Sequence, residues 1–471
     1  IYETSLSVAN GAGCSIGDQM HPLGEMNMST YNLIGKAYSL IEEKEPWLDN
    51  AQNVADIAVL SAESLTGGHD AKADIGANRM LLENNRLYNF IDGTMDFSEY
   101  KLLVLPDVEI KDESIIGKIK DFAEKGGKII ASAKAMTKDG KFFLDMGGEF
   151  MGENEFNPTY FVPAFETVNG NTEYIMKCNS FRFSASNCEV EAYVQNPYFN
   201  RTRDHFCSHA HTPNNPAEQF PAAVIKGNIA YIGWDIFSAY AKHGHLCFKE
   251  IFTHVLSKLM DDSFTVDVKI PDKAVVTYTR QEEEKRSILH LIFAHTTVRG
   301  ENTEVIEDTV PLYNVRCSVK KENKPSKVAL EPQGKEIEFE YNNGNVKFVV
   351  PDDAHLGTPI VYQSAVYSGL DIKNGISYIL PSINPTKAAH EFVGWFVGDN
   401  PSYRLTDNLG ETTLDITNGR QITFNSENLP NKYGTNEWSD TIFVYADFKR
   451  TSTQKYVEFQ YVVDDNIFET K

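Results

Sequence analysis

The sequence predicts a multidomain protein of mixed α/β and β class, because three patterns follow one another along its 471 residues. Residues 1–50 predict one strand, a glycine-rich loop and one helix. Residues 52–262 alternate short apolar strands with amphipathic helices, as in a mainly parallel sheet. Residues 263–363 and 364–471 hold short strands with alternating apolar side chains, typical of a β-sandwich followed by a small β-rich domain.

The composition is that of a globular protein, with 41% hydrophobic and 23% charged residues. The net charge is −22, from 44 basic and 66 acidic residues. Nucleic acids and anionic membrane surfaces reward an excess of Lys and Arg, so we expect neither as a partner. No apolar run approaches the ~20 residues that span a bilayer, so we expect no membrane span.

The six cysteines form no CxxC pair and are irregularly spaced, which argues against a zinc ribbon or a disulfide framework. Free thiols, most of them buried, are the expected state. We expect no cofactor.

Residues 1–50 predict one β-to-α unit. Thr4–Ala9 is the expected strand, and Ser29 or Thr30 can cap a helix that runs to about Glu45. A single unit of this kind cannot bury both of its faces. The economical interpretation is the last unit of a TIM-type barrel whose other strands lie before Ile1.

The loop between this strand and helix is rich in glycine and polar side chains. Its glycines do not have the spacing of a dinucleotide-binding loop. A loop after a barrel strand lies on the rim of the active site. Candidate substrate contacts are therefore Asn10, Asp18, Gln19 and His21. The alternative for each is a polar residue of an ordinary surface loop.

Residues 52–262 predict a flavodoxin-like or amidotransferase-like α/β domain with right-handed crossovers. Asp74 is the expected cap of the helix that follows the first strand, and Lys226-Gly227 the turn of a later hairpin. The expected strands and helices are 55–61, 75–87, 100–106, 113–125, 128–132, 190–194, 222–225, 228–234 and 247–260.

A hydrolase or amidotransferase of this architecture places its nucleophile on a tight turn after a strand. The candidate turn here, Ile130–Lys134, has no cysteine and no flanking glycine. Ser132 is the only nucleophile it offers, and the G-x-S-x-G pattern is absent. The sequence therefore indicates an amidotransferase-like fold without a catalytic site of its own. The alternative is an amidotransferase-like enzyme that uses Ser132 as its nucleophile.

The segment Asp204–Pro213 concentrates groups that carry chemistry. His205, Cys207, His209 and His211 stand at alternate positions, so an extended backbone would point all four to one face. Each pair of residues advances ~6.6 Å along a strand, so four such side chains cannot share one metal ion. We predict no metal site and take the three histidines as candidates for substrate contact. The alternative is a loop beside a sheet edge.

Four stretches are similar to one family of bacterial glycoside hydrolases, the α-L-fucosidase type that carries a β-galactosidase-like trimerisation domain. They are Gly11–Pro22, Lys44–Trp47, Gly76–Leu82 and Asp204–Pro213. The resemblance covers roughly residues 1–360. It implies that residues 1–50 end a catalytic barrel, that 52–262 form an amidotransferase-like trimerisation domain without a catalytic cysteine, and that 263–363 form a β-sandwich.

The resemblance also implies a function. The barrel hydrolyses a glycoside or oligosaccharide with carboxylates that lie upstream of Ile1, so this chain alone is expected to be inactive. The chain forms a homo-oligomer, a trimer or higher. A histidine from a neighbouring protomer reaches the active site, and by position this is His205, with His209 and His211 as substitutes.

The last part of the chain departs from that family. Gly375–Pro381, Glu391–Phe396 and Ile442–Phe448 resemble small β-repeats of bacterial surface proteins. This favours an exported or cell-surface protein, whereas the barrel family is often cytoplasmic. It also supports a rival hypothesis, a non-catalytic carbohydrate-binding or assembly module of a surface protein.

Overall fold

The computed structural model describes residues 1–350, apart from Asp70, Asn171, Asp262, Asn302, Asp308 and Thr309, and five strands beyond residue 350. The chain separates into two units, Ile1–Pro359 and Ile360–Lys471. Mixed α/β and sheet-rich architecture, as the sequence predicts, is confirmed for the first unit.

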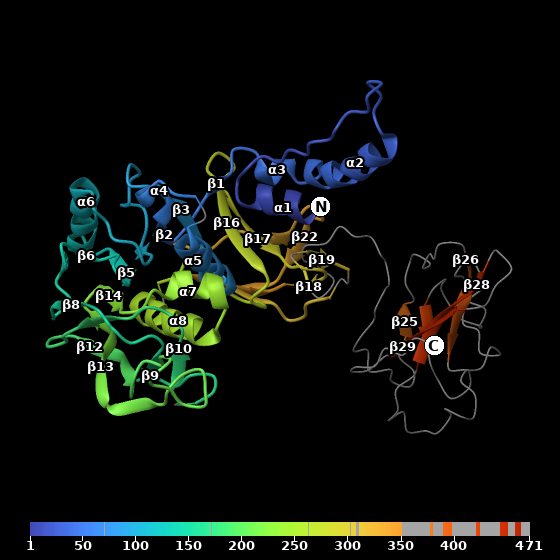
Figure 1. Ribbon diagram of the computed structural model, residues 1–471. Coiled ribbons are helices and arrows are strands. Elements are labelled where there is room, and N and C mark those ends of the chain that lie inside the picture. Colours follow the sequence, from blue (N-terminus) through green and yellow to red (C-terminus); the bar gives the residue numbers. More distant parts are fainter. Residues whose placement is uncertain are drawn as a thin grey trace. The chain divides into compact units, whose positions relative to one another are not determined.

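A nine-stranded sheet forms the centre of the first unit (Figure 1). Its parallel part has the order β3-β2-β4-β5-β14, which is 2-1-3-4-5 when these strands are counted along the chain. Every residue of β2, β4 and β14 is buried, as expected for parallel strands covered on both faces. The bounds are β2 Ile57–Leu60, β3 Tyr88–Ile91, β4 Leu102–Leu105, β5 Lys128–Ser132 and β14 Ile229–Ile232.

Helices cover both faces of this parallel part. Apolar side chains of α5, α7 and α8 share one hydrophobic core with it, and those of α6 share a second core. The expected helices 113–125 and 247–260 are confirmed, whereas β3 and α7 were not foreseen. The bounds are α4 Ala62–Thr66, α5 Lys72–Glu83, α6 Glu113–Glu124, α7 Ile236–His243 and α8 Leu246–Met260.

The remaining four strands extend the sheet beyond β14 in the order β13, β12, β9 and β10, each antiparallel to its neighbour. The Lys226-Gly227 turn joins β13 to β14, so the predicted hairpin is confirmed. A loop of 16 residues, 198–213, connects β12 to β13 and carries the histidine segment. The bounds are β9 Thr159–Pro163, β10 Tyr174–Met176, β12 Glu189–Pro197 and β13 Asn214–Lys226. Two small antiparallel pairs lie outside this sheet: β6 Thr137–Lys138 with β7 Lys141–Phe142, and β8 Phe150–Glu153 with β11 Phe181–Phe183.

Residues 263–350 form small antiparallel sheets around one hydrophobic core. The sequence predicts strands at 264–268, 275–279, 287–292, 315–319 and 346–350, and β15, β16, β17, β20 and β24 confirm them. It also predicts a tight turn at 342–344, where Asn343 and Gly344, both with positive φ, join β23 to β24. The bounds are β15 Val266–Lys269, β16 Val275–Gln281, β17 Arg286–Ile292, β18 Thr296–Val298, β19 Glu304–Ile306, β20 Arg316–Lys320, β21 Val328–Leu330, β22 Lys335–Ile337, β23 Phe339–Asn342 and β24 Asn345–Val349.

The predicted strand at Thr4–Ala9 is wrong, because Tyr2–Ala9 forms a helix, α1. Tyr2, Leu6 and Ala9 recur at helical spacing and pack together against Val275 and Ile292. The β-branched and small residues that suggested a strand instead bond within the helix, as when the Thr4 hydroxyl donates to the Ile1 carbonyl at 2.8 Å.

Two predicted helix caps are also wrong. Asn27, not Ser29 or Thr30, caps α2 (Met28–Glu42), since its side-chain oxygen accepts from the backbone N–H groups of both. The chain then breaks and continues as α3 (Glu45–Leu48). Asp74 lies inside α5 and caps the neighbouring α4, where its carboxylate accepts from the N–H groups of Ala62 and Glu63.

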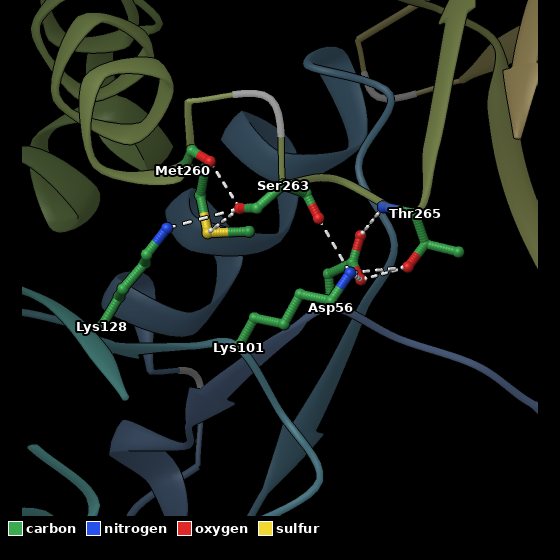
Figure 2. Close-up of polar contacts among 6 residues, drawn as sticks. All are labelled: Asp56, Lys101, Lys128, Met260, Ser263 and Thr265. Carbon is green, nitrogen blue, oxygen red and sulfur yellow. Dashed lines mark hydrogen bonds and ion pairs between the residues drawn. The ribbon is translucent and has the colours of Figure 1, made fainter. Parts of the chain in front are cut away.

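Asp56 joins the α/β region to the β-rich region that follows it (Figure 2). Its carboxylate accepts hydrogen bonds from the Thr265 N–H at 2.7 Å and the Thr265 hydroxyl at 2.6 Å, and it pairs with the Lys101 ammonium at 2.8 Å. Lys101 also donates to the Ser263 carbonyl at 2.8 Å. The side chain of Asp56 is only 3% exposed, so these contacts replace its hydration.

In the second unit the sequence predicts strands at 376–380, 392–396, 421–424, 441–448 and 456–463. They are confirmed as β25 Ser377–Ile379, β26 His390–Val397, β27 Gln421–Thr423, β28 Phe443–Arg450 and β29 Val457–Val462. β25 pairs with β27, and β26, β28 and β29 form an antiparallel sheet. The other residues of the predicted surface-repeat segments lie outside the described residues.

Candidate functional site

The four predicted rim residues lie on or beside the exposed loop that follows α1. Asn10 ends α1, and its side-chain amide donates to the Leu6 carbonyl at 2.8 Å. Asp18, Gln19 and His21 are exposed, and within the described part of the chain their side chains bond to no protein group. They are therefore free to contact a ligand, whereas Asn10 already has a structural role.

The histidine segment is a loop of bends and not an extended strand, so its four alternate side chains do not share one face. The Cys207 thiol donates to the His211 carbonyl at 3.3 Å and lies 3.6 Å from the His209 carbonyl. The backbone therefore curls around the Cys207 side chain. His205 and His209 are exposed, and His211 lies edge-on to the Tyr160 ring.

Both ends of this loop are bound to the sheet. The Tyr198 N–H donates to the Pro213 carbonyl at 3.1 Å and closes the loop. The Thr212 hydroxyl donates to the Phe199 carbonyl, and the Thr212 carbonyl accepts from the Tyr160 hydroxyl, each at 2.5 Å. The His205 ring lies on the Phe199 ring, with centroids 3.7 Å apart. The sequence pattern gave no signal for these supporting residues.

Ser132, the alternative nucleophile, is a fully buried structural residue. Its hydroxyl donates to the Asp107 carboxylate at 2.7 Å and accepts from the Asp107 N–H at 2.9 Å. The other Asp107 oxygen accepts from the N–H and hydroxyl of Ser238, and burial raises the pKa of Asp107. No histidine takes part in this cluster within the described residues. The Ser132 hydroxyl is fully buried and bound to Asp107, so it is not placed to attack a substrate.

The backbone after β5 has the form of a nucleophile turn without a nucleophile. Ala133 follows Ser132 with a φ of +48°, a left-handed conformation that is strained for a residue with a side chain. In enzymes of this architecture such a turn displays the reactive side chain. Here the strained residue is an alanine that is 1% exposed, so the turn displays nothing reactive.

Asp235 and Cys178 form a second buried polar group at the amino end of α7. Burial, with the nearby Asp107 carboxylate, raises the pKa of Asp235 to about 7. Its Oδ2 accepts from the Asn179 side-chain amide at 3.0 Å. Burial also raises the pKa of the Cys178 thiol well above its usual value, so Cys178 is not a reactive thiolate.

No three His, Cys, Asp or Glu side chains of the described residues come together in a metal-binding arrangement. Among the other histidines, His243 ends α7. The exposed His69 contacts Glu63 at 3.0 Å. Asp70, which follows His69 in the sequence, lies outside the described residues. All six cysteines are free, as predicted.

A cleft of about 720 Å³ opens beside the starts of β4 and β5 and is lined by four lysines, Lys101, Lys118, Lys125 and Lys128. Lys118 donates to the carbonyls of Gly93, Thr94 and Met95, and Lys101 is bound at the Asp56 junction. Lys128 donates to the Ser263 hydroxyl at 3.4 Å. Three of the four ammonium groups therefore hold the protein together, and we assign this cleft no ligand.

The two groups of predicted site residues lie at opposite ends of the first unit (Figure 1). The rim loop stands beside α2, beyond the β-rich region, whereas the histidine loop lies at the far end of the sheet, at β12 and β13. One copy of the chain therefore does not bring His205 to its own rim loop.

Comparison with known proteins relates this chain to glycoside hydrolases. Residues 79–153 match the family model of the beta-galactosidase trimerisation domain. The segment runs from α5 to β8 and includes the turn at Ala133. No curated protein sequence is significantly similar to this chain.

Among solved structures, the alpha-L-fucosidase isoenzyme 2 from Paenibacillus thiaminolyticus is similar at 39% identity and a TM-score of 0.72. The match covers 74% of this chain and 55% of that one, so the chain spans about half the length of this relative. A beta-galactosidase from Bacillus circulans sp. alkalophilus matches at 11% identity and a TM-score of 0.44, over 70% of this chain and 46% of that one. The predicted resemblance to the α-L-fucosidase type with a β-galactosidase-like trimerisation domain is confirmed by the fucosidase match and by the family model. None of the described helices has the length and apolar character needed to cross a membrane.

Proposed function

We propose that this chain is the C-terminal portion of an α-L-fucosidase-like or β-galactosidase-like glycoside hydrolase, and that it supplies oligomerisation and contacts at the substrate rim. The observation that carries this proposal is the 39% identity and TM-score of 0.72 with an alpha-L-fucosidase. The catalytic carboxylates lie upstream of Ile1. The chain alone is therefore inactive, and its partners are a glycoside and further copies of itself.

Residues 1–50 adjoin the catalytic barrel in this proposal. Seven of the large apolar side chains exposed by the first unit fall between residues 16 and 38, with Leu23 78% and Leu33 68% exposed. Apolar side chains gathered in this way mark a surface that packs against further protein. In this proposal the loop after α1 lies on the rim of the active site, although the segment before it is a helix and not the strand that the sequence predicts.

Residues 52–262 act as an amidotransferase-like trimerisation domain. The match over residues 79–153 supports this role. So does the parallel strand order 2-1-3-4-5, a doubly wound arrangement shared with flavodoxins. The turn at Ala133 displays no reactive side chain, which supports a role in assembly rather than catalysis for this domain. Residues 263–363 form the following β-sandwich, and 364–471 a small β-rich surface-repeat-like domain.

His205 acts on the active site of a neighbouring subunit, with His209 and His211 as substitutes for this role. A neutral imidazole can donate or accept one hydrogen bond to a sugar hydroxyl. The histidine loop also exposes Arg201, Arg203 and Phe206, whereas the rim loop exposes acidic and apolar side chains, among them Asp18 and Leu23. Opposite charge and exposed apolar area favour contact between the two loops of different copies.

The test uses the chain together with its upstream region. His205→Ala should lower kcat/KM for an aryl fucoside or galactoside at least ~10-fold, the loss expected for one hydrogen bond of ~1.4 kcal/mol in the transition state. His69→Ala, a change of an exposed histidine elsewhere, serves as the control. Unchanged turnover by the His205→Ala oligomer would contradict the role of His205.

A mixing experiment tests whether His205 acts in trans. One oligomer carries His205→Ala, and the other carries a substitution of an upstream catalytic carboxylate. Subunit exchange between these two impaired proteins should raise the activity above that of either one alone, because some active sites then receive an intact barrel and an intact histidine. Glycoside binding without turnover by the longer protein would instead favour the carbohydrate-binding module.

A further inference from the structure

Among the aromatic rings of the described residues, the His205 ring stacks on that of Phe199. The two ring centroids are 3.7 Å apart and the planes are inclined by 15°, so the rings are stacked. His205 is exposed and Phe199 is half-buried. An exposed imidazole without such a neighbour turns freely about two side-chain bonds, and holding it in one orientation costs conformational entropy.

Phe199 is attached to the sheet rather than to the tip of the loop. It lies two residues after the end of β12, and its carbonyl accepts from the hydroxyl of Thr212, which is 2% exposed. Thr212 is itself bound by the Tyr160 hydroxyl of β9. The position of the Phe199 ring is therefore set by the main body of the domain.

The neighbouring residue Asn200 strengthens this attachment. Its side-chain amide donates to the Glu155 carbonyl at 2.7 Å, and its oxygen accepts from the Asn157 N–H at 3.2 Å. The Asn200 side chain thus donates one hydrogen bond to the backbone of segment 155–157 and accepts one from it. The start of the histidine loop is held on two sides.

The backbone of His205 is held separately. The Thr202 N–H donates to the His205 carbonyl at 2.8 Å, and the His205 N–H donates to the Thr202 hydroxyl at 3.1 Å. This tight turn folds the chain back so that the His205 ring reaches the Phe199 ring. Backbone and ring are both fixed, although the residue lies on an exposed loop.

We propose that Phe199 is the positioning residue for His205, and that its ring fixes the imidazole plane so that a ring nitrogen meets a sugar hydroxyl of the neighbouring subunit's substrate. The proposal rests on the function proposed above. Phe199 itself touches no substrate. It acts through His205, since a histidine presented in one orientation needs no ordering when the transition state forms.

The first test needs only this chain and no activity. Protons of an imidazole that lies over a phenyl face resonate upfield because of the ring current. In the chain labelled at histidine ring carbons, Phe199→Leu should move the His205 ring signals downfield, with His205→Gln providing the assignment. Phe206→Leu is the matched control, because the Phe206 ring is 65% exposed and stacks on no aromatic ring of the described residues. His205 signals that are equal in the wild type and in Phe199→Leu would overturn the stacking.

The second test uses the longer, active protein. Phe199→Leu should lower kcat/KM ~10- to 100-fold, mostly through kcat, and Phe199→Tyr should restore it, because misplacement by ~1 Å can cost about 100-fold. The oligomer should keep its size in both variants. Loss in His205→Ala together with full activity in Phe199→Leu would overturn the positioning role alone, whereas full activity in His205→Ala would overturn the proposed function of the histidine.

Discussion

Asp235, at the amino end of α7, is the residue whose ionisation most directly links pH to stability. Burial raises its pKa from 3.8 to about 7. Between these two values the unfolded chain has lost this proton while the folded protein keeps it. Asp235 therefore stabilises the folded state fully below about pH 4, and this contribution is lost as the pH rises towards 7.

Asp235→Asn should remove this dependence, because an amide has no proton to lose and can still accept from Asn179. Relative to the wild type, we expect the variant to gain a few kcal/mol in free energy of unfolding between pH 4 and pH 7.5, since each pKa unit corresponds to ~1.4 kcal/mol. Urea denaturation of both proteins at several pH values measures this difference in the free energy of unfolding. A constant difference between the two proteins across that range would contradict the prediction.

The sequence identified the histidine loop but not its shape. Alternation of His205, Cys207, His209 and His211 is compatible with a strand, and only contacts from distant segments decide otherwise. The carbonyls that surround Cys207 and the Tyr160–Thr212 contact belong to a backbone path that no local pattern encodes. Phe199 could not be recognised as a partner of His205, because ring stacking leaves no periodic signal.

The contact between α5 and α7 depends on one residue without a side chain. A Cβ added to Gly76 would lie 1.8 Å from the carbonyl oxygen of Phe237, well inside van der Waals contact. Gly76→Ala should therefore force the two helices apart and lower the free energy of unfolding by about 3 kcal/mol, the upper part of the range for overpacking. Thermal or urea denaturation measures this loss.

Gly117 provides the matched control within α6. A Cβ added there meets nothing within 4 Å, so Gly117→Ala should raise stability by ~0.5–1 kcal/mol through helix propensity alone. Equal effects of the two alanines would show that the α5–α7 contact adapts without cost.

Helices and strands with a strong local sequence pattern were predicted correctly. Those that are selected by contacts with distant residues were not. The strand Lys128–Ser132 is confirmed residue by residue, because a continuous apolar run between Gly127 and a turn has few alternatives. α1 is different: Thr4–Ala9 is short enough to suit either structure. The contact of Leu6 and Ala9 with β16 and β17, more than 260 residues later in the chain, selects the helix.

At the scale of the first unit, segments far apart in sequence are interlocked. Gln52 of β1 (Gln52–Asn53) pairs with Arg280 of β16, and the Ala9 carbonyl accepts from the Thr277 hydroxyl. The sequence predicted the order of the regions, because composition and periodicity change between them. It did not predict that residues 1–53 pack against the β-rich region, since such pairing depends on the whole path of the chain.

Asp56 should be the residue that makes this unit unfold cooperatively. Its buried carboxylate is shared by Lys101 of the α/β region and Thr265 of the β-rich region. Asp56→Ala leaves the Lys101 ammonium and the Thr265 N–H without this partner. Because Lys101 is partly exposed, we expect a loss of about 1.5–3 kcal/mol, as for hydrogen bonds to a charged group. Glu153→Ala, which breaks an exposed pair with Lys134, should cost below ~1 kcal/mol.

The expected signature of Asp56→Ala goes beyond lower stability. With the junction weakened, the α/β region and the β-rich region should unfold in two separate transitions, whereas the wild type and Glu153→Ala should unfold in one. Hydrogen exchange at β4 and at β16 in rising urea distinguishes these outcomes, because each strand reports one region. Coincident opening of β4 and β16 in Asp56→Ala would show that other contacts, such as the pairing of β1 with β16, couple the two regions.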